Sequence, residues 1–122
     1  MKVVYIAGPY RAPTQWQIEQ NIFKAREVGV MVARLGAMLL IPHSNTAHMD
    51  GVADDQFWLD GTLELCRRCD ALVTVPGWTD SSGAKDEVNE MFALGKPVFH
   101  SQDQLSMLDF AQWIYSETSV GQ

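Results

Sequence analysis

The sequence predicts one α/β domain over residues 1–122, with an open parallel sheet of four to five strands and helices on both faces, as in flavodoxin-like and Rossmann-like folds. Two observations support this three-layer class. Short apolar runs alternate with longer amphipathic segments along the chain, which is the order that parallel strands joined by helical crossovers require. Most of these runs also end at Gly or Pro, which is typical of strands that lead into loops.

The first half of the chain contains two predicted strands and one long helix. Residues 3–7 are apolar without alternation, as expected of a central strand that is buried on both faces. Over residues 18–35 apolar side chains recur at helical spacing, and Gly36 ends the helix. Residues 37–41 form the second strand. The polar segment 44–55 is predicted to be a loop, long enough to carry a function.

The second half continues the same alternation. A helical pattern over 57–68 leads to a third strand at 71–75, which Pro76 and Gly77 end. The remaining predicted elements are a turn at 79–85, a helix at 87–94, a short strand at 98–99 and an amphipathic helix at 103–119.

Composition and charge exclude several classes of partner. The net charge of -6, with only nine basic residues, argues against binding to duplex nucleic acid. No apolar run approaches the roughly 20 residues that cross a membrane. The first residues run directly into a predicted strand, without the apolar segment of a secretory signal, so we expect a cytoplasmic protein.

Several motifs with known chemistry are absent or incomplete. Cys66 and Cys69 form a C-x-x-C pair, but no second pair of ligands lies at a suitable spacing, so we interpret them as small buried hydrophobes and expect no metal site. The sequence has no G-x-G-x-x-G, phosphate-loop or G-x-S-x-G motif. This excludes the dinucleotide-binding oxidoreductase, NTPase and serine hydrolase classes.

Polar and glycine-rich segments follow the predicted strands, where an open parallel sheet binds its ligands. Residues 8–11 follow the first strand, His43 follows the second, and residues 77–87 follow the third. Hydroxyls and amides near Ser81 and Ser82 could bind an anion at a helix start. The same serines could equally be plain N-caps, and the acidic side chains after them could simply complement the helix dipole.

Three segments carry a resemblance to the nucleoside 2-deoxyribosyltransferase superfamily. They are Tyr5-Ile6-Ala7-Gly8-Pro9-Tyr10-Arg11, the Asp70 that opens the third strand, and the Ser-x-Gly-x-x-x-Glu run that ends in Glu87. The sequence also resembles a branch of small bacterial and phage proteins that share the strings C-D-A, P-G-W and S-x-G-A, here Cys69-Asp70-Ala71, Pro76-Gly77-Trp78 and Ser82-Gly83-Ala84.

The resemblance implies three catalytic roles. Glu87 would attack the anomeric carbon of a nucleoside sugar, Tyr5 would orient this nucleophile, and an Asp on the preceding helix would protonate the leaving base. At the position of that acid this chain has Thr62, with Asp60 and Glu64 on either side. Asp60 is the candidate acid. The alternatives are Glu64, no acid at all, or a merely solvated helix carboxylate.

The resemblance further implies the substrate. Arg11 and Ser81 or Ser82 match residues that hold a 5'-phosphate, and a guanidinium suits that task because it pairs two phosphate oxygens at once. The remaining candidates for substrate binding are Gly8, Pro9, Tyr10, His43, Gly77, Trp78 and Gly83. Among them, the rings of Tyr10 and Trp78 would stack on a base. His43 would contact base or phosphate, with a structural or solvated histidine as the commoner alternative at a strand end.

We therefore expect hydrolysis of a (deoxy)nucleoside 5'-monophosphate through a covalent glycosyl-glutamate intermediate, with no cofactor. Base exchange by a deoxyribosyltransferase and a non-catalytic nucleotide-binding module are the alternatives. Relatives are oligomers, so the resemblance implies a homodimer or larger assembly. Apolar surface for such a contact is expected at Met91-Phe92 and around Trp113 and Tyr115.

Overall fold

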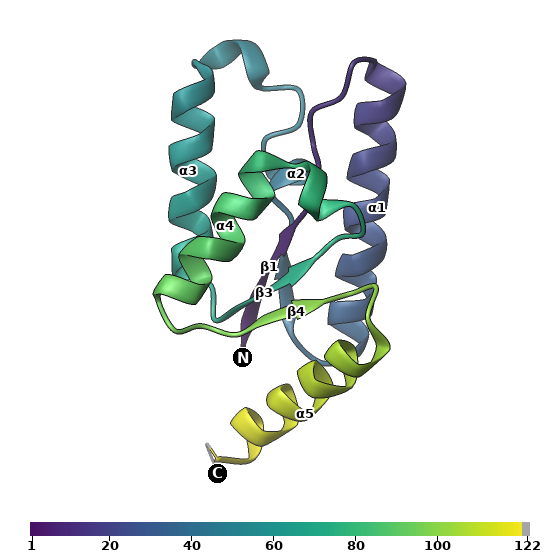
Figure 1. The fold of residues 1–122 in the computed structure, drawn as a ribbon, viewed down its shortest axis with the longest axis vertical. Helices are drawn as coiled ribbons and strands as arrows, with labels where there is room; N and C mark the ends of the chain where they lie inside the picture. The colour runs from purple at the N-terminus through teal and green to yellow at the C-terminus, as the bar shows by residue number, and fades with distance from the viewer. Residues whose placement is uncertain (121–122) are drawn as a thin grey trace.

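The structure, a computed structural model, describes the backbone of residues 1–120 and the side chains of residues 1–116. Its four strands form one parallel sheet in the order β2-β1-β3-β4 (Figure 1). The elements in chain order are β1 Val3–Ala7, α1 Gln15–Arg34, β2 Met38–Leu40, α2 Pro42–Asn45, η1 Asp50–Val52, α3 Asp55–Arg68, β3 Ala71–Thr74, η2 Trp78–Asp80, α4 Ser82–Ala93, β4 Val98–His100 and α5 Gln104–Val120.

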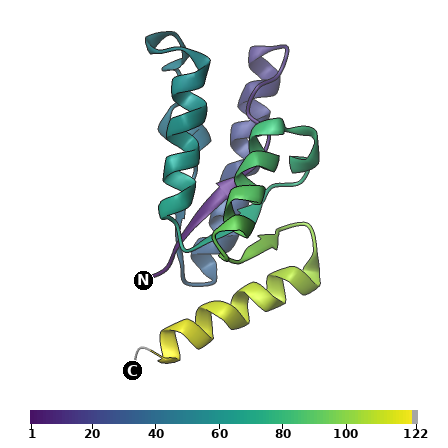
Figure 2. The same ribbon diagram turned by 60° about the vertical axis from the view of Figure 1, so that its left-hand side comes forward.

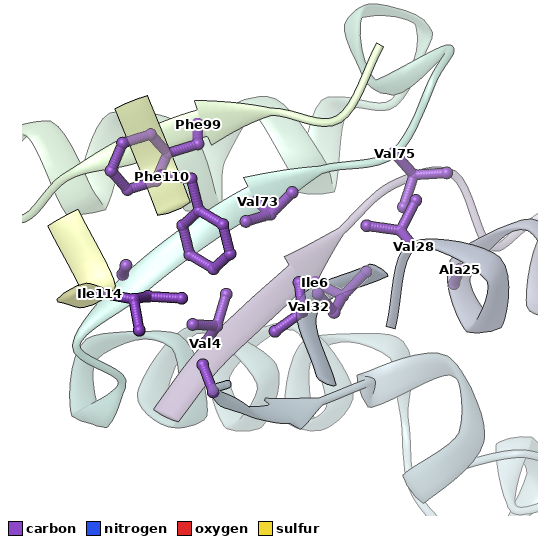
Figure 3. Close-up of a cluster of buried hydrophobic side chains, with 12 residues drawn as sticks. Val4, Ile6, Ala25, Val28, Val32, Val73, Val75, Phe99, Phe110 and Ile114 are labelled. Atoms are coloured by element: carbon purple, nitrogen blue, oxygen red, sulfur yellow. The ribbon is translucent and has the colours of Figure 1, made fainter. Parts of the chain in front are cut away.

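Helices cover both faces of this sheet, which confirms the three-layer α/β class. Side chains alternate between the faces along β1, as they do in any strand. Val4 and Ile6 pack with α1 and α5 in one buried cluster, which Figure 3 shows, whereas Tyr5 and Ala7 pack with α3 and α4 in the other. Figure 2 shows α3 and α4 lying together on the second face. Because β1 is central and buried on both faces, it forms a fixed base for the residues that follow it.

Capping side chains move two helix starts away from the predicted positions. Thr14 and Gln17 form a capping box, so α1 begins at Gln15 rather than at its first apolar residue. Ser81 caps α4 by accepting a hydrogen bond from the Ala84 amide, at 3.2 Å between Oγ and N. The prediction of a turn over 79–85 was therefore wrong in its second half.

Two other sequence predictions need correction. The segment 44–55 is not a continuous loop, because it contains the end of α2 and the 3-10 helix η1. Met91 offers no contact surface, since it is fully buried, and the Trp113 ring packs against Phe99 and Phe110. Phe92 and Tyr115 do lie exposed. None of the described helices is both long and apolar enough to cross a membrane.

Gly8 is required where β1 approaches the end of β3. The Val75 amide donates to the Ala7 carbonyl at 2.7 Å, and a Cβ on Gly8 would lie 2.5 Å from the Val75 Cβ. We expect Gly8→Ala to lower the free energy of unfolding by ~1–3 kcal/mol, because the Val75 Cβ is fixed to the backbone and cannot turn aside. Denaturant unfolding at constant pH measures this loss.

Gly29→Ala is the matched control for that substitution. A Cβ on Gly29 would meet the free ends of the Ile41 and Leu39 side chains, at 2.8 and 3.0 Å, and such ends can rotate. Alanine also favours the helix at this position by ~1 kcal/mol. An equal loss of stability in both variants would contradict the assignment of the strain to the Val75 contact.

Candidate active site

A cavity of about 410 Å³ opens beyond the carboxyl end of β1. Most of its lining comes from residues 8–11, the start of α2, one face of α3 and the first turns of α4. Figure 1 shows α1 and α3 extending past the ends of β1 and β3, with the start of α4 beside them. The strand-end rule therefore predicted the position of the cavity.

A hydrogen-bonded pair of buried side chains lines this cavity. Tyr5, from β1, is fully buried, and its hydroxyl group donates a hydrogen bond to Oε2 of Glu87, from α4. Glu87 is 9% exposed. The pKa of Glu87 is raised to about 7, chiefly by burial; the hydrogen bond from Tyr5 opposes this shift, and the nearby Asp86 adds to it. A carboxyl group with this pKa can serve as a nucleophile near neutral pH.

The raised pKa of Glu87 predicts how stability depends on pH. The folded protein keeps the Glu87 proton to about pH 7, whereas the unfolded chain loses it near the ordinary value of 4.5. We expect the free energy of unfolding to fall by up to ~3 kcal/mol between these pH values, relative to a Glu87→Gln variant. Denaturant unfolding of both proteins across this range measures the difference. A difference that stays constant with pH would contradict the assignment.

The first turn of α4 contributes residues with free backbone amides to the lining of the cavity. Ser81 is the N-cap, and Ser82 and Gly83 occupy the first two helical positions, where amides have no intrahelical acceptor. All three residues line the cavity. This arrangement can bind an anion through the amides and the helix dipole.

His43 is buried beside the segment that follows β1. Its Nε2 lies 3.1 Å from the Gly8 carbonyl and 2.8 Å from the Pro9 carbonyl, so Nε2 carries a proton and donates to them. Burial lowers the pKa of His43, although these hydrogen bonds oppose the shift. The ring of Tyr10 packs edge-on against it, with centroids 5.5 Å apart. His43 therefore anchors the 8–11 segment as a neutral imidazole.

Arg11 forms an ion pair with Asp55, the first residue of α3. Its Nη1 and Nη2 donate to the two carboxylate oxygens of Asp55 at 3.0 and 2.8 Å. Both side chains line the cavity and are largely exposed to solvent. The guanidinium beside Asp55 holds the pKa of that carboxyl group below its usual value.

The structure does not bring every predicted residue to the cavity. Asp60 lies on the exposed face of α3, where it accepts a hydrogen bond from Gln56 at 2.8 Å, and Glu64 pairs with Arg68. Gly77 adopts a left-handed turn with φ 88°, and the Trp78 ring stacks on His100 instead of lining the cavity. The positions of Asp60, Gly77 and Trp78 therefore differ from those that the sequence predicted.

Sequence reasoning missed one face of α3. Asp55, Trp58, Leu59 and Thr62 line the cavity at helical spacing, and Asp50 and Asp80 line it from the two 3-10 helices. The indole Nε1 of Trp58 donates to the Asp50 carbonyl at 3.4 Å beside the cavity. The helical spacing of these α3 residues could be read from the sequence, but the rotation of α3 that turns them toward the cavity could not.

The C-x-x-C pair lies in the core beneath the cavity. Cys66 and Cys69 are free and buried, and burial raises the pKa of their thiols to about 12 and about 11. Cys66 Sγ contacts the Glu87 carbonyl oxygen at 3.8 Å. Among the described side chains, those of residues 1–116, no group of three or more His, Cys, Asp or Glu is arranged to hold a metal ion.

The parallel sheet and its covering helices define the class: the domain has the nucleoside 2-deoxyribosyltransferase-like fold. A structure of the 2-desoxiribosyltransferase from Leishmania mexicana superposes with a TM-score of 0.57 at 21% identity, over 82% of this chain and 63% of that one. The 2-deoxyribosyltransferase from the psychrotolerant bacterium Bacillus psychrosaccharolyticus gives 0.59 at 22% identity, over 80% and 70%. The chain thus spans less than two thirds of the Leishmania protein.

The family is shown by the sequence itself. Over residues 2–103 the chain belongs to the family described as Domain of unknown function (DUF1937). No curated protein matches it.

Proposed function

We propose that this protein hydrolyses the N-glycosidic bond of a (deoxy)nucleoside 5'-monophosphate, with Glu87 as nucleophile. The observation that carries the proposal is the buried Tyr5–Glu87 hydrogen bond at a cavity large enough for a small ligand. A buried carboxylate that a tyrosine hydroxyl holds in position can trap the oxocarbenium-like sugar that forms when the base departs.

The reaction would proceed in two displacements. In the first, a Glu87 carboxylate oxygen bonds to the anomeric carbon while the bond from that carbon to the base nitrogen breaks. In the second, water attacks the same carbon, the bond to Glu87 breaks and restores its carboxylate, and the water proton passes to the carboxylate that protonated the base in the first step. Tyr5 holds the carboxylate in position for both steps.

The base that leaves in the first step needs a proton. The position of Asp60 weighs against it, because its carboxylate lies outside the cavity and binds Gln56. Asp50, Asp55 and Asp80 line the cavity, but both carboxylate oxygens of Asp55 already accept hydrogen bonds from Arg11. This leaves Asp50 and Asp80 as candidate acids among the described cavity residues.

The start of α4 and Arg11 support a phosphorylated substrate. The backbone amides of Ser82 and Gly83, in the first turn of α4, have no intrahelical acceptor. Both residues line the same cavity as the Arg11 guanidinium. Backbone amides at a helix start and an arginine fork are donors well suited to phosphate oxygens.

Base exchange on an unphosphorylated nucleoside is the second candidate, and the charge of the cavity favours it. Among the described residues that line the cavity, carboxyl groups belong to Asp50, Asp55, Asp80 and Glu87, whereas Arg11 provides the cation and is already paired. Such a lining repels a phosphate dianion more than a neutral sugar.

A substrate panel tests these candidates. Ribo- and deoxyribonucleoside 5'-monophosphates and the matching nucleosides are incubated with the protein, and free base is measured by chromatography, with and without a second base as acceptor. Release from monophosphates supports the hydrolase. Release from nucleosides that requires an acceptor supports base exchange. Binding without release, under all conditions, would reduce the protein to a nucleotide-binding module.

A further inference from the structure

We propose that Asp55 sets the preference between phosphorylated and unphosphorylated ligands, by holding the Arg11 guanidinium until a phosphate group displaces it. The inference rests on the proposed function for its substrate class. It concerns the contact between two exposed side chains, however, and can be measured without turnover.

The geometry shows that the phosphate-binding fork of Arg11 is already occupied. Two N–H···O contacts, at 3.0 and 2.8 Å, join the terminal guanidinium nitrogens Nη1 and Nη2 to the two carboxylate oxygens of Asp55. This is the bidentate arrangement that a phosphate group would also form. A phosphate held by Arg11 in this way must therefore take the place of Asp55.

The exchange is feasible because the ion pair is weak. Arg11 is 63% exposed and Asp55 is 72% exposed, and solvent screens an ion pair of this kind strongly. A phosphate dianion has a larger charge than a carboxylate, and it would also meet the amides at the start of α4. A neutral nucleoside offers no such competitor, so for it the pair stays closed.

Asp55 can be changed without removing the cap of its helix. Asp54 is the N-cap of α3 and accepts the hydrogen bond from the Phe57 amide at 2.9 Å, whereas Asp55 is the first helical residue. Asp55→Asn therefore removes the charge and keeps the side-chain shape and the cap. Its effect on ligand binding can be separated from an effect on folding.

The test measures binding of inorganic phosphate at constant ionic strength, by calorimetry and by the shift in Tm. The proteins compared are the wild type, Asp55→Asn, Arg11→Ala and the double variant. Asp109→Asn, at an exposed position of α5, makes the same change and is the control. We expect Asp55→Asn to bind phosphate ~3–10-fold more tightly, because Arg11 no longer has to leave a partner. Both variants that lack Arg11 should lose this gain, and the control should match the wild type.

Two results would overturn the inference: equal phosphate binding by the wild type and Asp55→Asn, or a gain that persists fully without Arg11. The substrate panel adds a second readout, in which Asp55→Asn lowers the ratio of the KM for a monophosphate to the KM for the matching nucleoside. If the wild type releases no base while the phosphate result holds, the proposed function fails and the role of Asp55 in ligand choice stands.

Discussion

A Glu87→Gln variant is expected to release base at least ~10³-fold more slowly than the wild type, because an amide cannot form the glycosyl ester. Gln has nearly the volume of Glu and can accept the hydrogen bond from Tyr5, so the fold should persist. Initial rates on the substrate that the panel identifies, with Tm measured alongside, give the result.

Glu90→Gln is the matched control on the same helix. Glu90 lies almost one turn further along α4, outside the cavity, and accepts a hydrogen bond from Arg67 at 2.9 Å. It should keep wild-type activity, because a surface ion pair contributes little to the free energy of folding. Comparable rates for Glu87→Gln and the wild type would rule out Glu87 as the nucleophile.

Tyr5→Phe should lower kcat by ~10–100-fold, the effect expected when a hydrogen bond to a charged group is lost. It should also shift the pH profile. Activity of the wild type should rise with pH as Glu87 loses its proton near its pKa of about 7. The Tyr5 hydrogen bond lowers that pKa, so without it the rising limb moves to higher pH.

The pH profile separates this role from a general effect on folding. Tyr115→Phe makes the same change at a side chain that is 75% exposed, and it should alter neither kcat nor the profile. A Tyr5→Phe enzyme with lower kcat and an unmoved limb would contradict the view that Tyr5 sets the ionisation of Glu87.

The fold could be predicted from the sequence because its central strands carry a strong signal. β1 and β3 are buried on both faces, so apart from Thr74 their residues are apolar or aromatic, and Gly or Pro follows each strand within two residues. Helix boundaries were less predictable. α4 begins at Ser82 because the Ser81 hydroxyl caps it, and polar residues of that kind look the same in a turn.

The residues of the candidate site were likewise predictable only in part. Gly8 to Arg11, His43 and Ser81 to Gly83 line the cavity because the strand ends and the start of α4 place them there. The contribution of α3 depends on how that helix is rotated. Asp60 lies two positions from Trp58 and from Thr62, which is about 200° around a helix, so its side chain points to the opposite face. The packing of α3 on α4 and on the sheet fixes that angle.

The surroundings of Glu87 have a further consequence for catalysis. Its neighbours in the buried layer, Tyr5 and Cys66, are weak acids whose pKa values burial raises, so both stay neutral. In the described part of the chain, the groups that shift the pKa of Glu87 include no cation. In the proposed reaction, an ionised Glu87 would thus have no cation among these groups while a neutral sugar is bound. The sugar would become positive as the base departs, so the transition state would supply the missing charge and would be bound more tightly than the substrate.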